Sequence, residues 1–417
     1  MSRFLQLHLL TSYPPSNPNR DDLGQPKTAR IGGHLRQRVS SQSLKRAWRT
    51  SEAFREELGA GEIELSDGFR EALLQSDLNV ERLHAHLGIR TKDLGIATYR
   101  AFEAGGMEDE KQRRAWTEPI VTAFAKRARP NTKTLKENPL ADLQTGQLVL
   151  FSAEELKAVD ELVTTLIGRK DEKDAAPTKE ELDLLREDHA ATDLALFGRM
   201  LADKSRFSGE AAAQVAHAFT VDVVKIEDDF FTAVDDLNLS PRTDAEDEDR
   251  GAAHLGEVGY GSGVYYVYAC IDCESLRDNL SGAEDADTLR DRALKAFAHA
   301  ALTVTPSGKR NTFAHHTYAH VALAERGDQQ PRSLAVAFLS PVESERGGKS
   351  PLDVAAERLK ATWEHTDTVY GACADDRYVL DNRPPPVDAR LSSDGTRDGF
   401  LDFVAGGSGN VTAPGNA

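Results

Sequence analysis

The sequence predicts an α+β fold in which helices pack on a sheet. Strand-like segments occur at residues 3–11 and 264–271, and the second is dense in β-branched and aromatic residues. A long stretch with helical periodicity, residues 62–190, lies between them. Strands interrupted by one long helical insertion, rather than alternating with single helices, favour an α+β arrangement over a parallel sheet.

Composition narrows the class of protein. The 417 residues correspond to about two to three domains at the usual ~100–200 residues per domain. No apolar run approaches the ~18 residues that a membrane-spanning helix needs, and the apolar stretch 4–10 is too short and too polar for a signal peptide. Three cysteines do not support a disulfide framework, which favours a reducing compartment. We therefore expect a cytoplasmic protein with no membrane partner.

The first forty residues combine a strand with an irregular segment. Residues 3–11 predict a half-buried strand, because Leu5, Leu7 and Leu9 would share one face. Residues 12–38 contain four prolines and three glycines, which is too many for regular secondary structure, so we expect a long loop. Loops of this length in a compact domain are usually functional or disordered.

A helix is predicted over residues 41–57, where the hydroxyl of Ser40 or Ser41 can cap the first turn. An apolar stripe on this helix would anchor it to the protein. Lys45 and Arg49 are four residues apart and share a different face. That cationic face is either a solvated surface or a binding surface.

The remaining chain continues the mixed pattern, with residues 62–190 forming an inserted helical subdomain. The other predicted elements are strands at 191–200, 214–224, 264–271 and 331–339, a glycine-rich turn at 251–263, helices at 285–301 and 352–363, and a low-complexity tail after Ala405.

The net charge of −17 argues against nucleic-acid binding, because phosphate-binding domains are usually basic. The average hides two extremes. Residues 1–50 contain nine Lys/Arg and two Asp, a net charge of +7, whereas residues 222–249 contain eleven Asp/Glu and two Lys/Arg, a net charge of −9. Such a split is typical of a small gripping surface on a chain that repels the same partner elsewhere, or of two solvated surfaces.

Metal and redox sites find little support. Cys270 and Cys273 have zinc-like or redox-like spacing, but a structural zinc needs four ligands and only Cys373 remains. We therefore predict buried thiols. A histidine cluster lacks an H-E-x-x-H pattern, so we expect polar surface or core histidines and no metal or cofactor. The cluster consists of His315, His316 and His320.

A nucleotide-binding enzyme is the alternative function. Gly348, Lys349 and Ser350 lie between a predicted strand and a predicted helix, as in a P-loop. The full motif needs glycine at position 343, where this chain has Glu343, whose carboxylate would repel phosphate. No carboxylate pair is marked out by its spacing as an acid and a base. We therefore expect no enzyme activity.

Three groups of residues match a known family in order and spacing. The first runs from Asn19 to Ala47 and ends in SSQSLKRA; the second is FGRM at 197–200; the third runs from FTAVDDL at 231–237 to SGV at 262–264. Together they resemble CasC, the repeated backbone subunit of the type I-E CRISPR surveillance complex, Cascade. The resemblance covers residues 1–55 and 192–280.

The resemblance implies an RRM-like (ferredoxin-like) palm, an inserted helical finger domain and a β-hairpin thumb. On this basis the palm comprises residues 1–58, 191–221 and 263–390, the finger domain 59–190, the thumb hairpin 222–262 and a flexible tail 391–417. The family is non-catalytic and serves antiviral defence. Its copies line up head to tail along the CRISPR RNA, with other Cascade subunits, and leave the bases free to pair with target DNA.

Matching motif positions imply a set of RNA-binding residues that supplies the cations and hydrogen-bond donors needed to hold a backbone. The set is Arg20, Lys27, Ser40, Gln42, Lys45, Arg46, Arg49 and Met200, and the expected thumb contacts are Phe231, Val234 and Leu237. Met200 would be an apolar wedge beside displaced bases or, alternatively, core filler. An acidic thumb could dock on the basic palm of the next copy. The acidic insertion at 238–249 has no counterpart in the family pattern.

Overall fold

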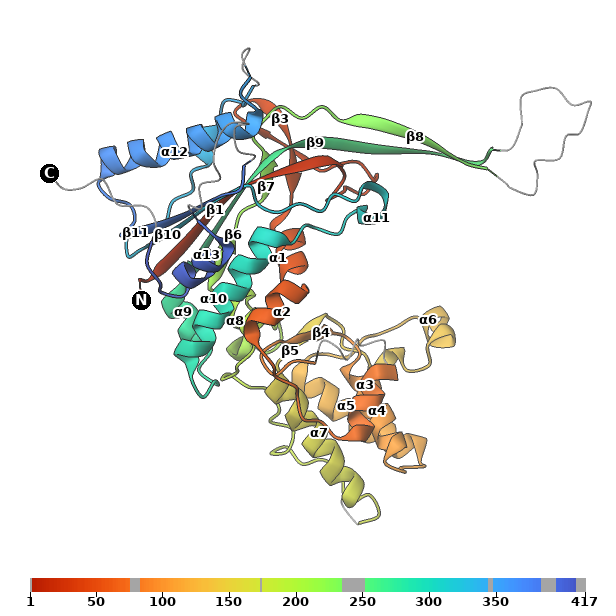
Figure 1. Cartoon of the computed structure of the whole chain (residues 1–417). Coiled ribbons are helices and arrows are strands. Elements are labelled where there is room, and N and C mark those ends of the chain that lie inside the picture. Colours follow the sequence, from red (N-terminus) through yellow and green to blue (C-terminus); the bar gives the residue numbers. More distant parts are fainter. Residues whose placement is uncertain are drawn as a thin grey trace, which may run out of the picture. The chain divides into compact units, whose positions relative to one another are not determined.

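The chain forms two compact units. The computed structural model describes residues 2–75, 83–172, 175–234, 252–343, 348–383 and 395–409. A helical unit comprises residues 55–214 and 271–296, and a sheet unit comprises residues 2–54, 215–270 and 297–417. Both are drawn in Figure 1. Each unit is described separately below.

The sheet unit is built on one sheet with the strand order β11-β10-β1-β9-β7-β3-β2. The pairs β1/β10, β10/β11, β2/β3, β3/β7 and β7/β9 are antiparallel. The mixed α+β fold with an antiparallel sheet is therefore confirmed. The strands are β1 (Phe4–Ser16), β2 (Thr28–Ile31), β3 (His34–Val39), β6 (Ala213–Val215), β7 (Ala218–Thr220), β8 (Glu227–Val234), β9 (Ala252–Asp272), β10 (Val321–Gly327) and β11 (Asp376–Asp381).

Helix α12 (Pro351–Tyr370) runs alongside this sheet and closes its core (Figure 1). Leu352, Ala355 and Leu359 of α12 belong to the same buried cluster as Leu10 and Leu323 from the strands. The α12 prediction at 352–363 is confirmed, with extra turns at the C-terminal end. The other helices of this unit are α1 (Ser41–Arg49), α11 (Arg310–Phe313), the 3-10 helix η4 (Ala335–Phe338) and α13 (Arg397–Val404).

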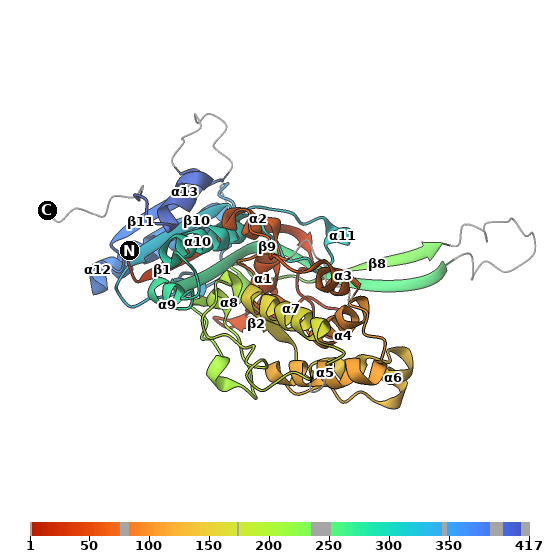
Figure 2. The same cartoon turned by 90° about the horizontal axis from the view of Figure 1, so that it is seen from below.

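Strand β9 is long enough to serve two purposes. Its C-terminal half pairs with β7 inside the sheet, where Tyr266 lies opposite Phe219. Its N-terminal half pairs with β8 from Glu227↔Tyr260 to Val234↔Ala252. Figure 2 shows this β8/β9 hairpin extending beyond the other strands.

The helical unit confirms the predicted helical character of residues 62–190. Its core is apolar and aromatic; the rings of Phe124 and Phe151, for example, lie 5.0 Å apart edge to face. A small antiparallel pair, β4 with β5, is also present. The elements are α3 (Asp67–Gln75), β4 (Ile89–Thr91), α4 (Leu94–Ala104), α5 (Glu110–Phe124), α6 (Thr132–Glu137), η2 (Ala141–Leu143), β5 (Val149–Phe151), α7 (Ala153–Gly168), α8 (Thr192–Phe197), η3 (Ser205–Phe207) and α9 (Cys273–Asp278). Helices α2 (Glu52–Leu58) and α10 (Ala286–Thr303) and strands β6 and β9 each include residues of both units.

The predicted loop at 12–38 is confirmed only over residues 17–27, and the residues on both sides of it are in strands. Strand β1 continues to Ser16, and β2 and β3 form a hairpin joined by Gly32 and Gly33. Both glycines have positive φ, 58° and 84°, the backbone of the two-residue turns that suit a twisted hairpin. Two adjacent glycines therefore mark a tight turn here, not an irregular segment.

Strand β1 is buried on both faces, not half-buried as predicted. His8 and Gln6, on the face opposite the leucines, are also inside. His8 Nδ1 lies 2.9 Å from the Tyr266 hydroxyl, and His8 Nε2 lies 3.2 Å from the Glu325 carboxylate. The polar side chains on this face are buried because they satisfy one another.

The helix predicted at 41–57 is interrupted. The Thr50 hydroxyl donates to the Arg46 carbonyl at 2.8 Å, and the Ser51 hydroxyl donates to the Trp48 carbonyl at 2.7 Å. Ser51 Oγ also accepts from the Phe54 N–H at 3.1 Å and so caps the next helix. Two short helices, α1 and α2, replace the single predicted one.

Other differences follow from short or ambiguous patterns. The strand predicted at 191–200 is helix α8, and the strand predicted at 331–339 contains η4. Residues 252–263 of the predicted glycine-rich turn at 251–263 are part of β9. The predicted flexible tail 391–417 did not anticipate α13, whose Phe400 and Phe403 are buried near Tyr378. No helix in the described part of the chain is long and apolar enough to span a membrane.

Candidate nucleic-acid interface

The loop from Asn17 to Lys27, called here the N-terminal loop, has a defined conformation. Asp21 Oδ1 accepts hydrogen bonds from the N–H groups of Leu23 at 3.0 Å and Gln25 at 2.9 Å. The Lys27 N–H donates to the carbonyl of Asn19 at 2.9 Å, which closes the loop. An exposed cation, Arg20, lies at one end and the half-buried Lys27 at the other.

Two asparagines attach this loop to neighbouring elements. Asn17 Nδ2 donates to the carbonyl of Gly259 in β9 at 2.8 Å. Asn19 Oδ1 accepts the N–H of Ser40, the residue before α1, at 2.9 Å. Neither asparagine was predicted as a site residue, because both act through residues distant in the sequence.

Helix α1 has the two faces predicted for it. Leu44 and Trp48 are buried, and the Trp48 ring contacts Phe297 edge to face at 5.2 Å. Ser40 Oγ accepts the Ser43 N–H at 3.3 Å, so Ser40 is the N-cap. The first turn carries no acidic residue, which leaves the helix N-terminus attractive to anions.

The predicted contact residues of α1 lie on its other faces. Gln42 and Arg46 are exposed, and Lys45 and Arg49 are half-buried. Burial lowers the pKa of the Lys45 ammonium. Together with Arg20, Lys27 and Ser40, the four side chains belong to two adjacent segments of the sheet unit, because Asn19 joins the N-terminal loop to the start of α1.

Arg38 and His217 extend this basic surface and were missed. The Arg38 guanidinium lies 3.1 Å from His217 Nδ1 and donates to the Thr28 carbonyl at 3.2 Å. Burial, and then the positive charges of Arg38 and Lys27, lower the pKa of His217. The neighbouring Arg36 is buried instead, where it donates to two backbone carbonyls and is therefore structural.

Alternate glycines in β9 allow the N-terminal loop and β3 to approach the hairpin. A Cβ at Gly259 would collide with the side chain of Gln25. Gln37 Oε1 would lie 2.5 Å from a Cβ at Gly261, and Asp222 Oδ1 would lie 2.9 Å from one at Gly263. Residues 259–263, which were expected to form a flexible turn, are thus a strand segment with glycines on one face. This segment is called here the hairpin root.

The hairpin itself carries acidic and aromatic side chains. Phe230 is 69% exposed and Phe231 is 43% exposed, and as neighbours in a strand they point to opposite faces. A Cβ at Gly256 would collide with the Phe231 ring, which covers that glycine. Val234 is the last residue of β8, whereas Leu237 and the insertion at 238–249 lie outside the described residues.

Met200 belongs to the helical unit and is 83% exposed. This exposure excludes the alternative that it fills the core. The preceding residue, Arg199, is buried and pairs with the Glu155 carboxylate at 2.8 Å. A buried ion pair thus fixes the backbone from which Met200 projects.

The residues that suggested nucleotide binding have other partners in the structure. Lys349 Nζ lies 2.8 Å from the Glu357 carboxylate. The Ser350 side chain caps α12 in a reciprocal arrangement with Asp353, so a carboxylate already occupies the helix N-terminus. Glu343 is exposed, and Gly347 lies outside the described residues.

The cysteines and histidines serve separate structural roles. Cys270 and Cys273 are buried, as predicted. His315 Nε2 lies 3.0 Å from the Pro306 carbonyl, and His320 Nδ1 accepts the Ser12 N–H at 3.3 Å. Within the described ranges, no three side chains of His, Cys, Asp or Glu form a metal-binding group.

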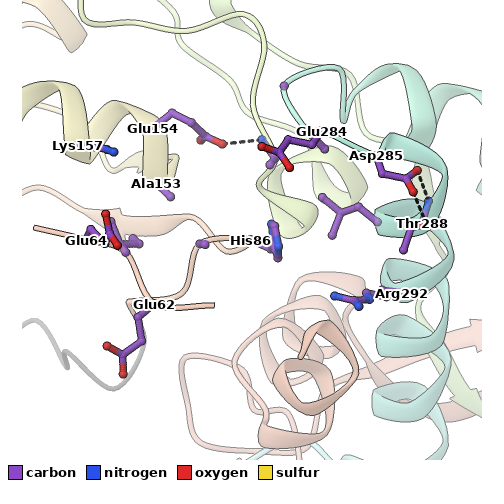
Figure 3. Close-up of a pocket in the computed structure, with 16 residues that line it drawn as sticks. Glu62, Glu64, His86, Ala153, Glu154, Lys157, Glu284, Asp285, Thr288 and Arg292 are labelled. Carbon is purple, nitrogen blue, oxygen red and sulfur yellow. Dashed lines mark hydrogen bonds between the residues drawn. The ribbon is translucent and has the colours of Figure 1, made fainter. Parts of the chain in front are cut away.

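A pocket of about 530 Å³ lies in the helical unit (Figure 3). Its charged lining is mainly acidic. Glu154 accepts the Ala190 N–H at 2.9 Å, and Asp285 accepts the Thr288 N–H at 3.0 Å. The charged lining residues are Glu62, Glu64, Glu154, Glu284, Asp285, Lys157 and Arg292. The excess of carboxylates disfavours a phosphate ligand.

A second basic segment, residues 126–136, lies in the helical unit and was also missed. It contains five Lys/Arg and no Asp or Glu. Lys126 pairs with Asp203, and Arg127 pairs with Glu118 at 2.9 Å. The other three, Arg129, Lys133 and Lys136, are exposed. The local charge was hidden by the acidic average of the chain.

Comparison with known proteins places the chain in a family. A family model described as "CT1975-like protein" matches residues 5–398. A chain of a structure described as "CRISPR RNA-guided surveillance complex, pre-nicking" is 25% identical, with a TM-score of 0.69 over 96% of this chain and 99% of that chain. A second, described as "CRISPR RNA-guided surveillance complex", is 22% identical, with a TM-score of 0.51 over 96% and 98%, and supports the fold alone. Comparison with curated protein sequences gives no significant match. The chain therefore belongs to the CT1975-like family, the CasC family of type I-E CRISPR systems.

Proposed function

We propose that this chain is the non-catalytic backbone subunit of a type I-E Cascade surveillance complex. Copies assemble head to tail along a CRISPR RNA, in contact with other Cascade subunits. Each copy holds the RNA backbone so that the bases stay free to pair with target DNA. The observation that carries the proposal is the basic surface formed by the N-terminal loop and α1 in a member of the CasC family.

The surface has the chemistry that backbone binding requires. Cations and hydrogen-bond donors in a fixed register bind phosphates without reading base edges. Arg20 and Arg46 supply exposed guanidinium groups, and Gln42 supplies an exposed amide. The α1 N-terminus adds backbone N–H groups with no competing carboxylate in the first turn.

We assign the two units to the proposed palm and finger. The sheet unit would be the palm, the helical unit the finger domain, and the β8/β9 hairpin the thumb. The helical unit is larger than the predicted insertion 59–190, because residues 191–214 and 271–296 belong to the same compact unit.

The hairpin is suited to contact a second copy. Asp228, Asp229 and Glu257 are exposed and give it a negative surface, unlike the basic surface at the N-terminal loop. Charge complementarity between the two supports docking of one copy's thumb on the next copy's palm. Exposed Phe230 and Phe231 would then contact RNA or the neighbouring copy on either face of the hairpin.

The helical unit would act on the nucleic acid in two ways. Met200 is an exposed apolar side chain on a fixed backbone, which suits a wedge beside displaced bases. The exposed cations at Arg129, Lys133 and Lys136 give the unit a second surface suited to a phosphate backbone.

The decisive experiment is co-expression with a CRISPR array and the partner subunits. The protein is washed at high salt, its ultraviolet absorbance ratio is recorded, and bound nucleic acid is extracted and sized. We expect a nucleic-acid spectrum and a discrete small RNA. A protein-only spectrum with no discrete RNA contradicts the proposal. ATP hydrolysis that is abolished by Lys349→Ala would instead support the enzyme alternative.

A further inference from the structure

Two left-handed residues bracket the short helix α11. Lys309 has φ of 51° and Ala314 has φ of 47°, and among the described residues they are the two non-glycine positions with positive φ. A Cβ disfavours this conformation, so it persists only where the surrounding structure imposes it, and such positions are concentrated at functional sites. The segment Ser307–His316, called here the α11 loop, is therefore held in a defined shape.

Buried contacts hold the α11 loop from inside. The Arg310 guanidinium donates to the Thr305 carbonyl at 2.7 Å. His315 is fully buried, with Nε2 3.0 Å from the Pro306 carbonyl and its ring 6.1 Å from that of Tyr13. Asn311 and His316 are exposed on the outer side of the loop.

The loop lies between two parts of the proposed RNA surface. A Cβ at Gly308 would collide with the Pro18 carbonyl in the N-terminal loop, so the two backbones touch. The Phe313 ring lies 5.7 Å from that of Tyr260 at the hairpin root. Figure 1 shows α11 beside the start of the hairpin. An RNA strand that passes between palm and thumb would therefore meet this loop.

We propose that the α11 loop is a third RNA-binding segment of the sheet unit, in which the Lys309 ammonium binds a backbone phosphate next to those held by the N-terminal loop. This inference rests on the proposed function. The loop contains Lys309 and Arg310 and no carboxylate. The carboxylate of Glu227, near this loop, is hydrogen-bonded to the Tyr260 hydroxyl at 2.9 Å.

The left-handed backbone at Lys309 makes the proposal separable from a structural role. Glycine adopts positive φ without a steric penalty, so Lys309→Gly removes the charge and relaxes the backbone at the same time. Lys309 would then strengthen RNA binding while it lowers the stability of the fold. If Lys309 had only a structural role, its replacement by glycine would not weaken RNA binding while leaving stability unchanged or higher.

The test compares Lys309→Gly, Lys309→Arg and the wild-type full chain. Binding of a fluorescent single-stranded RNA is measured over a series of salt concentrations, together with the thermal midpoint. We expect Lys309→Gly to melt at or above the wild type but to bind about fivefold more weakly, as for loss of one exposed ion pair. Its salt slope should be flatter by about 0.7, the value for one phosphate contact on a single strand. Lys309→Arg should keep the affinity and the salt slope of the wild type.

The control is Lys360→Ala, at an exposed position of α12, because glycine at this position would destabilise the helix. We expect Lys360→Ala to have no effect on RNA binding. Unchanged affinity and slope in Lys309→Gly, while Lys45→Ala and Arg49→Ala still weaken binding, would overturn this inference and leave the proposed function intact. A wild-type chain that binds no RNA would overturn both. Weaker binding with an unchanged salt slope would show that no phosphate contact is lost and would also overturn the assignment.

Discussion

The Asn19 side chain fixes the position of Ser40: its Oδ1 accepts the Ser40 N–H at 2.9 Å. One hydrogen bond thus joins the loop that carries Arg20 to the helix that carries Lys45. The cations of the two segments are held at a constant spacing, which a phosphate backbone with a regular repeat requires.

Replacement of Asn19 by alanine should lower both stability and RNA affinity. The Ser40 N–H would lose its partner, at an expected loss of about 1 kcal/mol in the free energy of unfolding. Denaturant unfolding and RNA binding measure the two effects. Thr396→Ala removes the N-cap of α13 and is the matched control. It should lower stability with no change in RNA affinity, and equal affinity losses in the two variants would argue against a specific role for Asn19.

Charge changes on α1 should weaken RNA binding regardless of RNA sequence. Lys45→Glu with Arg49→Glu places two carboxylates on the predicted contact face, so we expect weaker binding to several unrelated sequences. With alanine at both positions, the salt slope should become flatter by about 0.7 for each lost contact. Lys360→Glu on α12 keeps the change in net charge per substitution but lies outside the surface. Unchanged binding by the double variant would reject this face.

Alanine at Gly256 should disturb the hairpin. The new Cβ would displace the Phe231 ring that now covers this position. We expect shorter RNA-bound oligomers, which light scattering after size separation can measure. Gly168→Ala, where a Cβ meets nothing within 4 Å, is the control and should assemble normally. Normal oligomer length in Gly256→Ala would show that Phe231 is not needed at this place.

The buried ion network around Glu325 should contribute strongly to the free energy of unfolding. Arg332 Nη1 lies 2.6 Å and Arg377 Nε lies 2.7 Å from the fully buried carboxylate of Glu325. Glu325→Gln leaves two guanidinium groups beside a neutral amide, so the free energy of unfolding should fall by about 3–5 kcal/mol. Denaturant unfolding measures the loss. A loss below about 1 kcal/mol would place the network among ordinary surface pairs.

The same network predicts a pH dependence. Burial lowers the pKa of His8 below its usual 6.5, so the unfolded chain takes up a proton there that the folded chain does not, and stability falls as the pH decreases below about 6.5. Burial alone would raise the pKa of Glu325, but hydrogen bonds from His8 and Arg332 outweigh it and hold this pKa well below 4.5. The contribution of Glu325 is therefore lost only as the pH falls below about 4.5.

Unfolding at pH 7.5 and pH 5.5 separates the two groups. The decrease in stability between these values should be smaller in His8→Gln than in the wild type. Other histidines with lowered pKa, such as His189, change stability in the same direction, so some decrease should remain. An identical decrease in His8→Gln would show that His8 does not titrate in this range.

Local patterns predicted the parts of the molecule that depend on nearby residues. The two faces of α1 follow from helical periodicity, and its cap follows from a serine before the first turn. The aromatic and β-branched residues of 264–271 identified the C-terminal part of β9. Residues 62–190 were long and periodic enough for their helical character to be recognised.

The errors have a common physical cause, because they depend on what lies across the sheet. Gly261 indicates a turn when taken alone, yet it is in a strand whose missing Cβ leaves room for Gln37. Strand β10 was missed because Glu325 looks exposed until its two arginine partners are known. Asn19 and the α11 loop were missed because their contacts join residues far apart in the chain.

The alternate glycines of the hairpin root divide the hairpin into a constrained part and a permissive part. A single methyl group at Gly259 would push Gln25 away and disturb the loop that carries Arg20. Added chain between the two strands carries only a small closure cost, roughly 0.6 kcal/mol for each doubling of loop length. Residues added between β8 and β9 therefore cost little, whereas a side chain added at the hairpin root disturbs the N-terminal loop. Engineered insertions between β8 and β9 should be accommodated for the same reason, which makes this hairpin a practical site for labels.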